Sequence, residues 1–151
     1  MTYLAWNNKY LVGMEVLDYQ HQQIFAKINE VYDALMRGAA PTATAEKMHQ
    51  FTIAARDHFA TEEAILSAAG YPGLSTHRVL HVELIRRVQA YCSRCKCGEN
   101  VLSPHLLNFL RDWFAHHLEC ADHEYAVWLK EFLGADCSFE DAREPDAAQI
   151  H

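Results

Sequence analysis

The 151 residues have the length of one domain, and a composition that is half hydrophobic and 22% charged excludes a collagen-like or disordered chain. A formal net charge of −7 argues against nucleic acid and anionic lipid as partners, because both are negatively charged. No stretch approaches the ~18 consecutive apolar residues of a membrane span, and the N-terminal segment lacks a signal-peptide core, so we expect no membrane contact.

An extended N-terminal arm precedes the first predicted helix, for which Asp18 is the expected N-cap. Residues of a buried face recur at helical spacing from His21 to Leu35, and the pattern stops before Gly38. A second pattern of the same spacing runs from residue 51 to residue 69. It ends at residues 70–73, Gly-Tyr-Pro-Gly, where glycine permits a left-handed residue and proline cannot continue a helix.

The third pattern extends from His77 to Tyr91 and gives way to a cysteine-rich segment. Ser103-Pro104 begins the fourth, because a capping hydroxyl followed by proline is a typical helix start, and Gly134 ends it. Four such helices with short connections predict an all-α protein, an up-down-up-down antiparallel four-helix bundle with an extended N-terminal arm. The bundle domain is expected to span residues 1–134, and the acidic residues 135–151 to form a flexible tail.

Six polar side chains fall within the apolar patterns, on faces that the bundle must bury: His21, His58, Glu62, His77, His81 and His117. A buried polar group without a partner costs ~1–3 kcal/mol, so these side chains need a partner that they share. A metal ion is the simplest such partner. The other histidines fall outside the patterns and are expected at the surface: His49, His105, His116, His123 and His151.

Helical spacing brings four of these polar side chains together in two pairs. His58 and Glu62 are four residues apart, as are His77 and His81, so each pair projects from one face of its helix. Five histidines and one carboxylate are too many donors for one ion that keeps an open position. We therefore expect two ions that share the carboxylate.

The fourth helix supplies the remaining candidates. Its periodicity selects His117 over His116, which lies ~100° further round the helix. Asp122 is the candidate for a second bridging carboxylate. An ideal helix turns residues at this spacing ~140° apart, so Asp122 reaches the site only if the local geometry is favourable.

These residues resemble the hemerythrin family, in particular its bacterial single-domain members, the bacteriohemerythrins. The resemblance extends from Trp6 to about Tyr125, nearly the whole chain before its tail. It rests on these motifs: Trp6, Val12-Gly13, Asp18-Tyr-Gln-His21, His58-Phe-Ala-Thr-Glu62-Glu63, Gly70-Tyr-Pro72, His77-x-x-x-His81 and Trp113-x-x-x-His117-x-x-x-x-Asp122.

The resemblance implies two iron ions (Fe²⁺/Fe³⁺) with an oxo or hydroxo bridge. One ion would take His77, His81 and His117, the other would take His21 and His58, and Glu62 and Asp122 would bridge them. With the bridge and the two shared carboxylates included, the ion with three histidines would have six donors. The ion with two histidines would have five, so one octahedral position would stay open. The implied function is reversible dioxygen binding for storage, delivery or sensing, without enzymatic turnover.

Apolar residues within about one turn of the ligands are expected to wall the dioxygen pocket: Ile24, Phe25, Phe59, Trp113, Phe114 and Leu118. The family usually has leucine at the position of Phe114, so the bulkier ring is expected to narrow the pocket in this chain.

The cysteines Cys92, Cys95 and Cys97 are not part of the family pattern. Three thiols are one short of a structural zinc set, so we interpret them as free thiols. The odd total of five cysteines also favours a reduced protein in the cytoplasm.

The main alternative function is that of a di-iron enzyme with peroxidase or nitric-oxide-reducing activity. Oxygen-activating bundles usually carry more carboxylates, whereas five imidazoles and two carboxylates favour binding over turnover. A purely structural bundle does not account for polar residues on buried faces, and a sensory module would require an output domain.

The expected partners are dioxygen and a cellular reductase or oxygen-consuming enzyme, and the polar outer faces favour a monomer.

Overall fold

The computed structural model describes residues 2–96 and 103–134, without the side chains of residues 95 and 96. Helices run in the order η1 (Asn8–Tyr10, 3-10), α1 (Glu15–Met36), α2 (Pro41–Ala69), α3 (Leu74–Lys96), α4 (Pro104–His117), η2 (Leu118–Asp122, π) and α5 (His123–Gly134). The predicted tail and the thiols of Cys95 and Cys97 lie outside the described residues.

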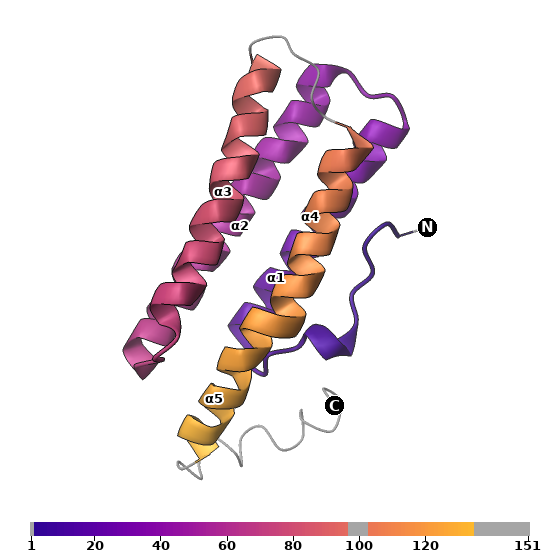
Figure 1. Ribbon diagram of the computed structural model, residues 1–151. Helices are drawn as coiled ribbons and strands as arrows, with labels where there is room; N and C mark the ends of the chain where they lie inside the picture. The colour runs from indigo at the N-terminus through magenta and orange to yellow at the C-terminus, as the bar shows by residue number, and fades with distance from the viewer. Residues whose placement is uncertain (1, 97–102, 135–151) are drawn as a thin grey trace.

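The helices form the predicted antiparallel four-helix bundle, and α5 continues the line of α4 as one long rod (Figure 1). No strand occurs in residues 2–96 and 103–134, which confirms the all-α fold class. Across the same residues, no helix is both long and apolar enough to span a membrane.

Glycine and proline end and begin the helices as their chemistry requires. Gly38 and Gly70 have φ of 70° and 75°, a left-handed conformation that side chains with a Cβ rarely adopt. Pro41 occupies the first turn of α2 and Pro104 the first turn of α4, where a missing N–H costs nothing.

The prediction that Asp18 is an N-cap is wrong, because α1 begins at Glu15 and Met14 is the residue that caps it. The Asp18 carboxylate instead accepts hydrogen bonds from the backbone N–H groups of Val12 (2.7 Å) and Gly13 (3.2 Å). The arm turns back at Val12 and Gly13, so the carboxylate accepts hydrogen bonds from residues that precede the helix. Asp18 therefore ties the arm to α1.

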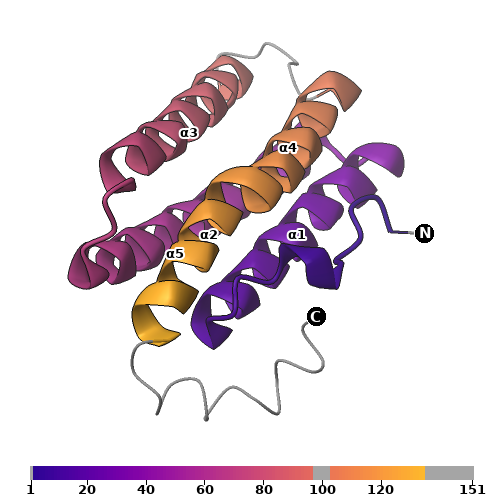
Figure 2. The same ribbon diagram turned by 60° about the horizontal axis from the view of Figure 1, so that its bottom comes forward.

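The N-terminal arm runs along the bundle beside α1 (Figure 2). Trp6 packs edge-to-face on Phe25 at a ring-centroid distance of 5.1 Å. Asn29 accepts a hydrogen bond from the Leu4 backbone N–H and donates one to the Leu4 carbonyl, as a strand neighbour would. The arm thus covers one face of the apolar core.

The buried apolar side chains fall into two clusters. The larger one includes Ile28, Phe51 and Leu110, and the smaller one includes Leu17, Leu66 and Tyr125. Between them, the cross-section of the bundle is filled by buried polar residues, which form the candidate site.

The tie between Asp18 and the arm gives a stability prediction. Replacing Asp18 with alanine should lower the free energy of unfolding by about 2 kcal/mol, because two backbone donors lose a charged acceptor. Chemical denaturation measures the change. The matched variant Asp33→Ala removes an exposed carboxylate from the same helix and should stay within ~0.5 kcal/mol of the parent. Equal effects of the two substitutions would contradict the assigned role.

Candidate metal centre

The structure brings all seven predicted ligands together in the middle of the bundle. Each is at most 4% exposed, and Glu62 and Asp122 are fully buried. Their donor atoms form two groups, within each of which all atoms lie within 4.8 Å of one another: Glu62, His77, His81 and His117 in one, and His21, His58, Glu62 and Asp122 in the other. Helices α1, α2, α3 and the α4–α5 rod all contribute.

Glu62 divides its two oxygen atoms between the two groups. Oε1 lies 2.8 Å from Nε2 of His77 and 3.0 Å from Nε2 of His81. Oε2 lies 3.2 Å from Nε2 of His58 and 3.7 Å from Nε2 of His21. One oxygen for each group is the arrangement of a carboxylate that bridges two ions.

Asp122 repeats this division from the other side. Oδ1 lies 3.0 Å from Nε2 of His117 and 3.1 Å from Nε2 of His77, while Oδ2 lies 3.1 Å from Nε2 of His21. Each of the two carboxylates therefore faces both groups of histidines.

A π-helical turn explains how Asp122 reaches the site. Leu118–Asp122 form the π-helix η2, whose hydrogen bonds span five residues instead of four. A wider turn carries more residues for each revolution, so His117 and Asp122 return to the same side of the rod. The favourable local geometry that the sequence left open is this turn.

The donor set fits a metal better than it fits hydrogen bonding alone. All five histidines present Nε2 to the centre, and Nε2 of His81 lies 3.3 Å from Nε2 of His117. Both nitrogen atoms of His21 and both oxygen atoms of Asp122 are buried without a hydrogen-bond partner in the described residues, although Nε2 and Oδ2 are only 3.1 Å apart. Imidazole nitrogen and carboxylate oxygen are donors that suit iron and zinc.

The electrostatics of the site keep the carboxylates ionised. Burial opposes the charge on Glu62, but four histidine hydrogen bonds hold its pKa well below the usual value, and contact with His117 lowers the pKa of Asp122 despite its burial. Burial also opposes charge on His21 and His77, yet the two carboxylates raise the pKa of each to about 9. Burial lowers the pKa of His58. Protons and a cation therefore compete for the same nitrogen atoms.

Three residues for which the sequence predicted no role at the site support the ligands. The Tyr125 hydroxyl donates to Oε2 of Glu62 (2.7 Å), Glu63 Oε2 lies 2.7 Å from Nδ1 of His81, and Gln20 Oε1 lies 2.9 Å from Nδ1 of His58. Glu63 and Gln20 are direct neighbours of predicted ligands in the sequence, and Tyr125 lies three residues after Asp122. Proximity in the sequence to the ligands could have marked these three residues as candidates. The sequence could not show which ligand on another helix each of them contacts.

The predicted wall residues Ile24, Phe25, Phe59, Phe114 and Leu118 are buried in the larger apolar cluster, and Trp113 is half-buried against it. Phe59 stacks on the His81 ring at 3.8 Å, and Trp113 stacks on the His117 ring at 4.4 Å. These stacked rings hold the orientation of two imidazoles.

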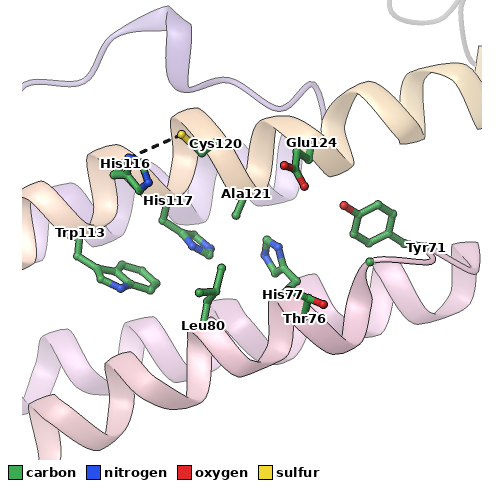
Figure 3. Close-up of a pocket in the computed structure, with 11 residues that line it drawn as sticks. Tyr71, Thr76, His77, Leu80, Trp113, His116, His117, Cys120, Ala121 and Glu124 are labelled. Carbon is green, nitrogen blue, oxygen red and sulfur yellow. Dashed lines mark hydrogen bonds between the residues drawn. The ribbon is translucent and has the colours of Figure 1, made fainter.

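Trp113 also lines a cleft of about 410 Å³ between α3 and the α4–α5 rod (Figure 3). His77 and His117 point into this cleft from opposite walls, and His116 and Cys120 lie at its edge. Trp113 is thus placed on the side of the group with three histidines. His116 is exposed, as are His49, His105 and His123, whereas His151 lies outside the described residues.

The bundle and its buried histidine–carboxylate centre together define a class of helical metal-binding domain. The chain belongs to the hemerythrin family: the model of the hemerythrin HHE cation binding domain matches residues 12–129. A bacteriohemerythrin of Pseudomonas aeruginosa is 34% identical over 138 residues, which cover 87% of this chain and 90% of the relative. A bacteriohemerythrin of Stenotrophomonas maltophilia is 32% identical over 88% of this chain and 86% of its own length.

Two further similarities are more distant. A hemerythrin from Sipunculus nudus is 26% identical, over 83% of this chain and 92% of the relative. A crystal structure of wild-type hemerythrin superposes with a TM-score of 0.78 at 21% identity, over 83% of this chain and 96% of the other.

The register of the fourth helix can be tested by metal content. His117→Ala should lose at least one of two bound metal ions, because its Nε2 faces the centre. His116→Ala is the matched control and should retain both, since its side chain is exposed at the cleft edge. Elemental analysis after loading with ferrous iron gives the answer. Loss of metal from the His116 variant, with retention in the His117 variant, would contradict this register.

The hydroxyl of Tyr125 gives a second prediction. Tyr125→Phe leaves one oxygen of Glu62 without its donor and should weaken metal binding ~10–100-fold, as removal of such outer hydrogen bonds commonly does. Competition with a chelator measures the affinity. Tyr19→Phe removes the same hydroxyl from a residue that is 63% exposed and should change nothing. An unchanged affinity in the Tyr125 variant would refute its role.

Proposed function

We propose that this protein binds dioxygen reversibly at a non-haem di-iron centre, for storage, delivery or sensing of oxygen. The observation that carries the proposal is the pair of donor groups that share the fully buried Glu62, with a second buried carboxylate, Asp122, that faces histidines of both groups. When bound there, two ferrous ions supply the electrons that reversible dioxygen binding takes up. Membership of the hemerythrin family supports the assignment.

The proposed ligands divide unequally between the two ions. His77, His81 and His117 would hold one ion, His21 and His58 the other, and Glu62 and Asp122 would bridge them, with an oxo or hydroxo group completing the bridge. The side of His21 and His58 thus has one protein donor fewer. We assign the small ligand to this side.

The surrounding residues suit binding more than turnover. The apolar side chains Ile24, Phe25, Phe59, Phe114 and Leu118 keep water from the centre and so protect a bound ligand from exchange. Burial and the nearby carboxylates raise the pKa of Tyr125 well above its usual value, and its proton stays on the hydrogen bond to Glu62. This hydroxyl is thus already engaged with a proposed ligand side chain.

The alternative is a di-iron enzyme with peroxidase or nitric-oxide-reducing activity. The cleft beside His77 and His117 favours this alternative, because it brings the edge of two ligand rings close to an external reductant.

For the dioxygen-binding function, we further propose a cellular reductase or oxygen-consuming enzyme as partner, a monomeric state and a cytoplasmic location.

The optical spectrum distinguishes the two functions. Protein loaded with two ferrous ions without air should gain a visible absorption band when air enters, and should lose that band when oxygen is removed. Rapid consumption of oxygen, peroxide or nitric oxide in the presence of a reductant would favour the enzyme. A protein that takes up zinc and no iron would contradict both.

A further inference from the structure

The outward nitrogen atoms of the ligand histidines have unequal partners. Nδ1 of His81 lies 2.7 Å from a carboxylate oxygen of Glu63, whereas Nδ1 of His58 lies 2.9 Å from the amide oxygen of Gln20. Nδ1 of His21 has no hydrogen-bond partner in the part of the chain that the structure describes. The side with three histidines therefore has an anionic partner behind it, and in these contacts the side with two histidines does not.

The orientation of the Gln20 amide follows from its neighbours. The Thr61 hydroxyl donates its proton to the Asp57 carbonyl at 3.0 Å, so its oxygen accepts the Gln20 Nε2–H at 3.3 Å. The amide oxygen of Gln20 consequently faces His58, whose Nδ1 must donate. The partner of His58 is thus a neutral acceptor, held in place.

The Glu63 carboxylate is held in place by an ion pair with Arg78 that joins α2 to α3. Its Oε1 accepts from Nε of Arg78 at 2.9 Å while Oε2 faces His81, so one carboxylate of α2 joins two residues of α3. The Glu63 side chain is 20% exposed and His81 is 2% exposed, whereas Arg78 is 49% exposed. The negative charge therefore acts on His81 with less solvent screening than the positive charge at the surface.

We propose that Glu63, acting through His81, makes the two metal ions electronically unequal. A carboxylate behind a ligand imidazole increases the basicity of that imidazole and so favours the more highly charged metal ion. The ion of His77, His81 and His117 is then the harder one to reduce. The first electron from a reductant goes to the ion of His21 and His58, the side with fewer protein donors. This inference rests on the ligand assignment of the proposed function.

Charge-swapping variants test the inference on the iron-loaded chain, reduced stepwise with dithionite in a spectroelectrochemical cell. Glu63→Gln keeps the shape but removes the charge, and should raise the lower of the two reduction potentials. Gln20→Glu adds a charge behind His58 and should lower the higher one. A tenfold change in the ratio of ferric to ferrous affinity corresponds to ~59 mV for each one-electron step. Each variant should therefore reduce the gap, the difference between the two reduction potentials, by at least ~59 mV.

Two further variants exclude a general charge or packing effect. Arg78→Gln removes the counter-charge from Glu63 and should widen the gap, a shift opposite in sign to that of Glu63→Gln. Glu83→Gln removes an exposed carboxylate from α3 and should leave both potentials unchanged. If Glu63→Gln moves the gap no more than Glu83→Gln does, or if Arg78→Gln moves it in the same direction, the inference is overturned.

Zinc affinity provides a readout that needs neither redox chemistry nor oxygen. Glu63→Gln should weaken zinc binding ~10–100-fold in competition with a chelator, and an unchanged affinity would count against the inference. Failure of the proposed function is distinct: a chain that takes up two iron ions but does not bind dioxygen reversibly still yields both potentials. A chain that takes up fewer than two ions refutes both.

Discussion

The structure depends on one constraint, the burial of two carboxylates and five imidazoles in the middle of an otherwise apolar bundle. Isolated charges in such a place would cost far more than a domain of this size can tolerate, so the buried groups must compensate one another. Each carboxylate turns one oxygen to each group of histidines. All four helical segments of the bundle are held together at this cross-section as a result.

The backbone adapts locally to meet this constraint. A straight α-helix would turn Asp122 away from His117, and the π-helical turn of Leu118–Asp122 brings the two side chains back together. Lys9 of the arm lies 2.9 Å from Glu119 within this turn, so the arm also contacts the irregular segment. Rings complete the support, with Phe59 against His81 and Trp113 against His117.

Much of the fold and of the ligand set could be predicted from the sequence, because helical periodicity and the chemistry of buried histidines are local signals. The four helices, the preference for His117 over His116, and six of the seven candidates followed from residue spacing, whereas the full ligand set with Asp122 came from the resemblance to the hemerythrin family. The predicted start of α1 was wrong because the Asp18 carboxylate accepts hydrogen bonds from the backbone of the N-terminal arm. This is a tertiary contact, which the helical pattern does not reveal. The π-helical turn and the partners Tyr125, Glu63 and Gln20 depend on how the helices pack, which spacing alone does not encode.

The most direct test of this account is anomalous diffraction at the iron edge from crystals of the protein loaded with ferrous iron. Two peaks inside the bundle are predicted, one among His77, His81 and His117 and one beside His21 and His58, with Glu62 and Asp122 between them. A single peak, or iron only at the protein surface, would contradict the central claim that these seven side chains form one dinuclear site.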